Sequence, residues 1–378
     1  MRFKRESYLL LLIAIVSVFM LAACGDGTEQ SSSANENDNQ SETESENAES
    51  GSDTETEESM QPVTLSFADF APPMHPAQAK LFPEWAEAIH EATDGLVSID
   101  LYPGGSLLGS GDIYPGVESG IADIGHDVSG YNGGRLPVLN AMYLGGVEYK
   151  NTAVSSYVAR DLVKELDPEE LHDTELMFIY GIAPGLLMTI DPVRSLEDLQ
   201  GMQIRASGTN VETLEALGAS PVAMPVSETY EALSRGVVDG SLLPADTLES
   251  FKLAEVVNYV THSSLIYNTV HYVTMNKDVW NSFPAHIQEA IREVNEEYFE
   301  VAIEMYTEEV ERGLQYAVEE HGVEEIHLSE EETQRWHDAL GSLVEDHIEY
   351  LNSEGLNGQE IMDKIFELTE KYNKEFGD

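Results

Sequence analysis

Arg205 is the residue whose type and position most clearly predict a chemical role. It stands at the end of a predicted strand, residues 202–206, and a helix is expected directly after it because Thr209 and Glu212 have capping-box spacing. In open α/β folds, ligands bind where strands give way to helix N-termini, and the free backbone N–H groups there add to the attraction of a guanidinium for an anion. The segment therefore predicts a binding site for one carboxylate.

The elements around Arg205 form a repeating module. Strands are predicted at residues 202–206, 220–226 and 237–243, with helices between them. Residues 63–128 follow the same order of strands and helices. Two such modules in one chain predict an α/β fold with two lobes facing each other across a cleft. Residues 285–321 carry helical periodicity and predict a helix long enough to underlie both lobes.

The first 24 residues are typical of an export signal. A basic start is followed by an apolar stretch too short for a stable membrane span, and small residues precede Cys24. The run 21–24, Leu-Ala-Ala-Cys, resembles a bacterial lipobox, which implies that Cys24 becomes the lipidated first residue. The alternative is an ordinary secretory peptide that contains this cysteine. Cys24 is the only cysteine of the chain, so an intrachain disulfide and a cysteine-rich metal site are excluded.

Residues 25–62 are rich in Ser, Glu, Asn and Thr and lack Lys and Arg, which predicts a disordered acidic tether. The whole chain has 70 acidic against 19 basic residues and a net charge of −51. Such a charge disfavours nucleic acid and anionic lipid surfaces as partners, because both are bound through basic patches. We interpret it as a surface adapted to a saline or alkaline exterior. Calcium binding is the alternative, although no DxDxDG loop is present.

Motifs for catalysis were sought and not found. The sequence lacks a GxSxG elbow, an HExxH motif, a phosphate-binding GxxxxGK[ST] loop and a GxGxxG turn after a strand. Its histidines are scattered, and His321 and His327 do not have the spacing of metal ligands. The sequence therefore predicts no enzyme activity, no cofactor and no metal site.

Four segments together resemble one known family: residues 201–205 (GMQIR), 217–221 (LGASP), 227–233 (SETYEAL) and 236–240 (GVVDG). They are similar to the DctP-type solute-binding proteins of tripartite ATP-independent periplasmic (TRAP) transporters. The resemblance implies closure of two lobes about a hinge on a small organic acid, which is then delivered to a membrane permease. The family's carboxylate-binding arginine falls on Arg205.

The resemblance runs from about Val63 to Phe376 and implies a two-lobed periplasmic-binding-protein fold of the class II type. Two further helices are predicted near residues 329–352 and 358–376. The implied division of the chain assigns residues 63–182 with 269–308 to lobe I, and residues 183–268 with 309–378 to lobe II.

Two positions depart from the family pattern. Many relatives for sialic acids or dicarboxylates carry a second arginine where this chain has Gly185, and a polar residue where it has Leu243 before Pro244. A pocket with one guanidinium suits a monocarboxylate with an apolar or aromatic body, since unpaired buried polar groups cost affinity. The predicted ligand contacts are Arg205, Tyr180, Met188, Leu243, Tyr131, His75, His126, Phe70, Asn268 and Arg135.

For several of these residues a structural role is the alternative. The aromatic side chains could belong to the core, His75 and His126 could be satisfied structural histidines, and Arg135 could serve the surface or the hinge instead of replacing the missing arginine. The function that we expect is an extracytoplasmic, lipid-anchored solute-binding protein of a TRAP transporter. A ligand sensor that docks on a membrane receptor is the alternative.

Overall fold

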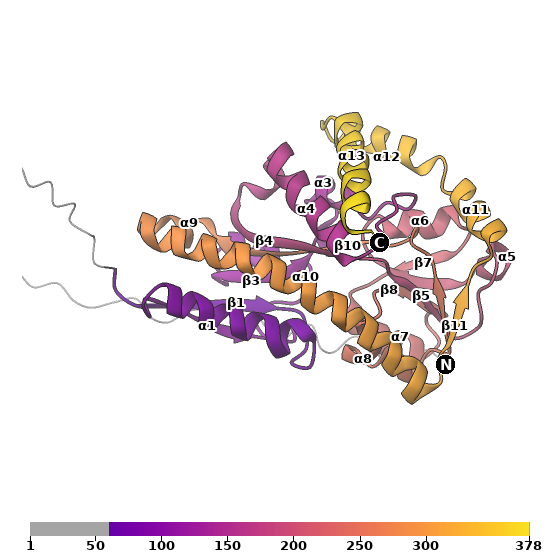
Figure 1. The fold of residues 1–378 in the computed structure, drawn as a ribbon, viewed down its shortest axis with the longest axis horizontal. Helices are drawn as coiled ribbons and strands as arrows, with labels where there is room; N and C mark the ends of the chain where they lie inside the picture. Colours follow the sequence, from indigo (N-terminus) through magenta and orange to yellow (C-terminus); the bar gives the residue numbers. More distant parts are fainter. Residues whose placement is uncertain (1–59, 378) are drawn as a thin grey trace, which may run out of the picture. The chain divides into compact units, whose positions relative to one another are not determined.

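The computed structural model describes residues 60–377. The predicted signal segment, Cys24 and nearly all of the predicted tether lie outside this range. Two β-sheets, each with helices packed on it, make up the described part (Figure 1). Within it, no helix combines the length and the apolar character needed to cross a membrane.

The first sheet has the strand order β2-β1-β3-β10-β4. Strands β1 (Val63–Asp69), β2 (Val97–Tyr102) and β3 (Ile124–Val128) are parallel, whereas β10 (Thr269–Asn276) runs antiparallel between β3 and β4 (Thr174–Ile182). All residues of β3 and β10 are buried, as expected for central strands covered on both faces. The strands predicted within residues 63–128 are confirmed.

The second sheet has the strand order β11-β9-β5-β8-β6-β7. The three strands predicted around Arg205 are present as β6, β7 and β8 and are parallel to one another, although β7 and β8 are shorter than predicted. Strand β5 is antiparallel to β8 and β9, and β11 pairs in parallel with β9 at the edge. The bounds are β5 Leu186–Thr189, β6 Gln203–Ala206, β7 Ser220–Ala223, β8 Gly240–Leu243, β9 Tyr259–His262 and β11 Glu324–His327.

Helices cover both sheets. Their bounds are α1 Phe82–Ala92, α2 Ile113–Glu118, α3 Pro137–Ala141, α4 Thr152–Leu166, α5 Leu196–Leu199, α6 Asn210–Ala216, α7 Thr229–Ser234, α8 Thr247–Ser250, α9 Lys277–Asn281, α10 Ala285–His321, α11 Glu330–Ala339, α12 Leu343–Ser353 and α13 Gly358–Phe376.

The predicted long helix is confirmed as α10, with 37 residues between Pro284 and Gly322. Helix α10 packs on α1 and on strand β4 of the first sheet, and on α8 next to the second sheet. Figure 1 shows that α10 runs past both sheets. A Cβ atom at Gly313 would lie 2.2 Å from the carbonyl oxygen of Ala245. Glycine is therefore required where α10 meets the loop after β8, and this contact fixes the position of Asp246 in that loop.

The structure differs from the sequence predictions at the start of α6 and in the helices after residue 329, and it shows where α13 packs. Thr209 is the N-cap of α6 without a side-chain cap, because its hydroxyl donates to the carbonyl oxygen of Asn140 (2.8 Å). The helix expected at residues 329–352 is two helices, α11 and α12, separated at residues 340–342. Helix α13, which the sequence assigned to lobe II, packs against α4, and α4 covers β4 of the first sheet.

Candidate functional site

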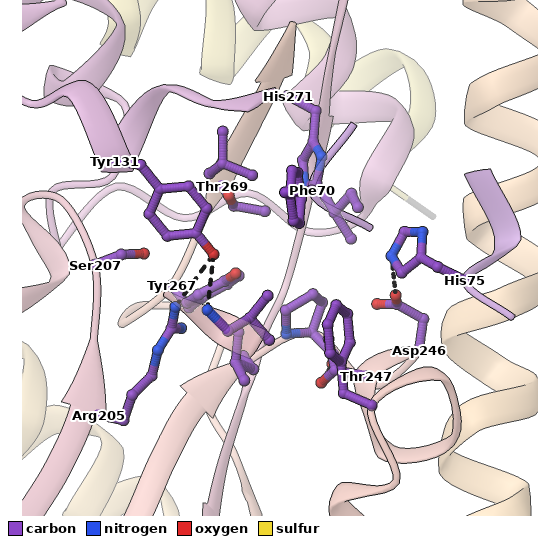
Figure 2. Close-up of a pocket in the computed structure, with 16 residues that line it drawn as sticks. Phe70, His75, Tyr131, Arg205, Ser207, Asp246, Thr247, Tyr267, Thr269 and His271 are labelled. Atoms are coloured by element: carbon purple, nitrogen blue, oxygen red, sulfur yellow. Dashed lines mark hydrogen bonds and ion pairs between the residues drawn. The ribbon is translucent and has the colours of Figure 1, made fainter. Parts of the chain in front are cut away.

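A pocket with a free volume of about 30 Å³ lies between the two sheets, and Figure 2 shows the residues that line it. Its walls come from the two sheets and from the segments that cross between them. The lining residues are Phe70, His75, Val128, Tyr131, Ile182, Arg205, Ser207, Val226, Leu243, Pro244, Asp246, Thr247, Phe251, Tyr267, Thr269 and His271. This free volume lies far below the usual range for ligand pockets, so an organic acid can enter only if the walls of the pocket move apart.

Arg205 reaches this pocket from the end of β6 and is only 1% exposed. Its Nε donates to the carbonyl oxygen of Met224 (2.9 Å), and one terminal nitrogen, Nη2, donates to the Tyr131 hydroxyl (3.3 Å). The other terminal nitrogen, Nη1, is buried without a hydrogen-bond partner in residues 60–377. A buried guanidinium with an unused donor is costly unless an anion pairs with it. The geometry therefore fits a carboxylate at Nη1, as the sequence predicts.

Tyr131 connects the two sides of the pocket. It belongs to a short 3₁₀ helix after β3, Ser129–Asn132, and its hydroxyl oxygen accepts from Arg205 and from the backbone N–H of Val226 (3.1 Å). Burial raises the pKa of Tyr131, so the phenol stays protonated. Since both acceptor positions of the oxygen are taken, its own proton is free to be donated to a ligand.

Aromatic side chains form much of the remaining wall. Phe70 stacks on His126 (ring centroids 5.2 Å apart) and meets Tyr131 edge-on (5.8 Å). Phe251 lies against His75 on the other side (5.6 Å). Such a surface favours a flat apolar or aromatic group.

Asp246 is a pocket residue that sequence reasoning missed. His75, from the loop after β1, lies beside it, with 3.6 Å between His75 Nε2 and Asp246 Oδ2 (Figure 2). Neither carboxylate oxygen of Asp246 has a hydrogen-bond partner among the described residues. Burial raises the pKa of Asp246 to about 7 and lowers that of His75 to about 4. Asp246 lies shortly after the end of β8, which was a predicted strand, and this position could have indicated a pocket residue.

Two predicted ligand residues, Tyr180 and His126, lie behind the pocket wall instead of lining it. His126 joins Asp69 through Nδ1 (2.9 Å) and approaches both the Tyr180 hydroxyl and His271 Nδ1 through Nε2 (3.1 Å each). In this buried network only His271 lines the pocket, and burial lowers its pKa. His126 and Tyr180 therefore support the pocket wall from behind, and His271 is the residue of this network that lines the pocket.

Three other predicted contacts are also outside the pocket lining. Met188 is fully buried in β5. Asn268 is buried and donates to the carbonyl oxygen of Met142 (3.1 Å). Arg135 is partly exposed and forms ion pairs with Glu118 and Asp173 (2.8 Å each). Arg135 therefore does not replace the missing second arginine.

Gly185, where the resemblance leads us to expect an arginine in some relatives, lies against another side chain. A Cβ atom at Gly185 would lie 2.3 Å from the ring of Tyr267, and Tyr267 lines the pocket. No larger residue fits at position 185 while the ring stays there. The sequence showed that position 185 is a glycine, but it did not indicate that Tyr267 packs against it.

Comparison with known proteins agrees with this geometry. The model of the DctP family, described as "Bacterial extracellular solute-binding protein, family 7", matches residues 67–350. The chain belongs to this family.

One curated relative of this DctP-family protein is the C4-dicarboxylate-binding periplasmic protein DctP of Rhodobacter capsulatus, 26% identical over 306 residues, which are 78% of this chain and 89% of the relative. A solved TRAP periplasmic solute-binding protein from Desulfovibrio salexigens is 31% identical, with a TM-score of 0.72 over 84% of this chain and 97% of its own. A marine-metagenome TRAP protein specific for aromatic acid ligands, solved with metahydroxyphenylacetate, is 28% identical, with a TM-score of 0.78 over 82% and 99%.

These similarities confirm the two-lobed α/β fold of periplasmic binding proteins. The family and its structural relatives are solute-binding proteins and not enzymes, which agrees with the sequence prediction. The family consists of extracellular solute-binding proteins, and the relative from Rhodobacter capsulatus is periplasmic.

Proposed function

We propose that this DctP-family protein captures a small monocarboxylate with an apolar or aromatic body and delivers it to a TRAP permease. The observation that carries the proposal is that Arg205 lines the pocket while its Nη1 is buried without a hydrogen-bond partner among residues 60–377. The free proton of the Tyr131 hydroxyl, beside Arg205, supplies a second donor. Two donors on one side of a small pocket suit the two oxygens of one carboxylate.

The preference for one carboxylate over two rests on what surrounds Arg205. No other arginine or lysine lines the pocket, and Tyr267 occupies the space beside Gly185. Leu243 and Phe70 present apolar surface, so a second carboxylate would be desolvated without a cationic partner. The relative that is specific for aromatic acids supports the same ligand class.

Asp246 adds a second polar position to the proposed ligand. Its two unpaired carboxylate oxygens lie in the pocket near His75, whereas the carboxylate position is at Arg205. A hydroxyl group on the ligand would donate to Asp246 and satisfy one of these oxygens. The proposed ligand is therefore a hydroxylated aromatic or branched monocarboxylate.

The contacts between the two sides support capture by closure. Tyr131 and His75 come from the first-sheet side, and their partners Arg205, Val226 and Asp246 come from the second. We place lobe I at residues 63–182 with 269–308 and lobe II at 183–268 with 309–378, with α13 returning onto the lobe I helix α4. The hinge then lies where the chain crosses between lobes, next to Gly185 and Asn268.

The cellular location follows from the N-terminal sequence. Cys24 at the end of a lipobox-like run would anchor the protein in the membrane on the extracytoplasmic face, and residues 25–62 would hold the folded part away from it.

Calorimetry and thermal shift with matched acids test the ligand class. Phenylacetate, 3-hydroxyphenylacetate, mandelate and 2-hydroxyisovalerate are compared with succinate and malate. We expect the hydroxylated monocarboxylates to bind most tightly and, at a hundredfold excess over Kd, to stabilise the protein by about 2.7 kcal/mol. Tighter binding of the dicarboxylates would overturn the proposed ligand class and leave the family assignment intact.

A further inference from the structure

Three potential metal ligands converge at the outer edge of the second sheet. His262 ends β9, and Glu325 and His327 belong to the edge strand β11. The parallel pairing of these strands places His327 directly beside His262. Glu325 lies two residues before His327, and side chains two apart in a strand point to the same face. The three side chains therefore share one face of the sheet.

Their atoms lie at distances suited to a shared ion. The two imidazole rings stack with centroids 4.3 Å apart, and His262 Nε2 lies 3.0 Å from Glu325 Oε2. One candidate ligand atom from each residue lies within 4.8 Å of the other two. Ligand atoms around a tetrahedral zinc ion are roughly 3.4 Å apart for bonds of about 2.1 Å, so modest side-chain rotations complete the geometry.

The charge of the protein also favours a cation at this cluster. The net charge of −51 favours the approach of cations.

We propose that His262, His327 and Glu325 form a binding site for one divalent transition-metal ion, with zinc as the preferred class. Two imidazoles and one carboxylate are ligands that zinc accepts, whereas magnesium and calcium prefer sites made of oxygen atoms alone. Both histidines line a solvent-open hollow of about 320 Å³, so water can complete the coordination.

The bound ion would hold the edge of the second sheet together. Strand β11 has four residues and pairs with β9 alone, and it connects α10 to the C-terminal helices. A metal shared by the two strands links β11 to β9 by bonds that do not depend on the backbone ladder. None of the three residues lines the organic-acid pocket, so this site is independent of the proposed function.

The sequence alone did not predict this metal site. The expectation of no metal site rested on the scatter of the histidines and on the spacing of His321 and His327, and His262 is far from His327 in the chain. Only the pairing of β9 with β11 brings them together.

Zinc titration by calorimetry tests the proposal. The full chain is used without a histidine tag, in a Cys24→Ser background that removes its only thiol, after treatment with EDTA and dialysis. We expect one zinc ion per chain, a melting temperature that rises with ZnCl2, and no such rise with MgCl2 or CaCl2. Cobalt in place of zinc should give the absorption of a four-coordinate ion.

Single variants show whether these residues are the ligands. His262→Ala and His327→Ala should each weaken zinc binding at least about tenfold, and Glu325→Gln should weaken it less. The matched control is His172→Ala, because His172 is an exposed histidine that also pairs with a carboxylate, Asp167 (3.0 Å). It should bind zinc as the parent does.

Hydrogen exchange provides a second measurement if a variant folds poorly. In the parent chain, zinc should slow exchange of the β11 amides selectively. Binding of zinc that is equal in all variants, including His172→Ala, or the absence of any stoichiometric binding, would overturn the proposal. Organic-acid binding should persist in EDTA, so either outcome leaves the proposed function untouched.

Discussion

The ring of Tyr267 lies directly over Gly185, so close that a Cβ atom at position 185 would be 2.3 Å from it. Tyr267 is 5% exposed and lines the pocket that contains Arg205. One aromatic side chain thus covers the backbone at the position where the family resemblance leads us to expect a second arginine in dicarboxylate binders, and it adds apolar wall to the pocket. This relationship connects the sequence departure at Gly185 to the proposed ligand class.

Gly185→Ala should therefore disturb the pocket. The added methyl group forces Tyr267 to move, and overpacking of this kind costs about 1–3 kcal/mol. Thermal melting and calorimetry with the best monocarboxylate should show lower stability and weaker binding. Gly134→Ala is the control, because a Cβ atom there meets nothing within 4 Å. Equal behaviour of the two variants would contradict the role given to Tyr267.

Arg205→Ala should weaken carboxylate binding by about 2–5 kcal/mol, since a charge-assisted pair in a dry pocket is lost. Arg205→Lys should recover little, because an ammonium group lacks the planar arrangement of donors. Calorimetry measures both. Arg292→Ala provides the control, as Arg292 is an exposed residue paired with Glu289 (3.4 Å), and it should bind ligand normally. Retained affinity in Arg205→Ala would remove the basis of the proposed site.

Asp246→Asn should alter the pH dependence of stability in the absence of ligand. Burial raises the pKa of Asp246 from an ordinary 3.8 to about 7, so the native state holds a proton that the unfolded state releases. Stability is therefore lost as pH rises from about 4 to 7, by up to about 4 kcal/mol. The variant lacks this loss and should become progressively more stable relative to the wild type over that range.

Urea denaturation of both proteins at several pH values checks this prediction. The wild type and the variant share the other buried acids with raised pKa, Asp127 and Glu170, so the contributions of those groups cancel in the difference. A difference in unfolding free energy that is constant between pH 4 and 8 would show that Asp246 does not titrate in this range.

The melting temperature should rise from low to molar NaCl. Residues 63–378 carry 57 acidic and 16 basic residues, a net charge of −41, so self-repulsion destabilises the compact state when screening is weak. The Debye length falls from about 30 Å at 0.01 M to about 3 Å at 1 M. Differential scanning calorimetry over this range provides the measurement. An unchanged melting temperature would indicate that local ion pairs already compensate the charge.

Cys24→Ser should release the protein from the membrane and leave ligand binding intact, because the thiol is the predicted attachment point of the lipid. Cell fractionation followed by calorimetry on the released protein measures both effects. Retention of the variant in the membrane fraction would argue against lipid anchoring through Cys24.

Most strands and helices, and the position of Arg205 at a strand end, could be predicted from the sequence alone. The helical periodicity of residues 285–321 gave the bounds of α10 that the structure shows, because periodicity is read from one segment alone. Arg205 could be placed at a strand end for the same reason, since strand and helix signals are local. Local signals persist whatever the rest of the chain does.

Only the tertiary structure decided which side chains face the pocket. Tyr180 and His126 lie behind the wall, while His271 and Asp246 line it. The distinction depends on strand pairing and on the place of α10, where Gly313 allows close approach to the loop that carries Asp246. The pairing of His262 with His327 likewise needs β9 and β11 to meet. Such contacts join residues that are distant in the chain. They could not be predicted because the periodicity of one segment does not specify which other segment packs against it.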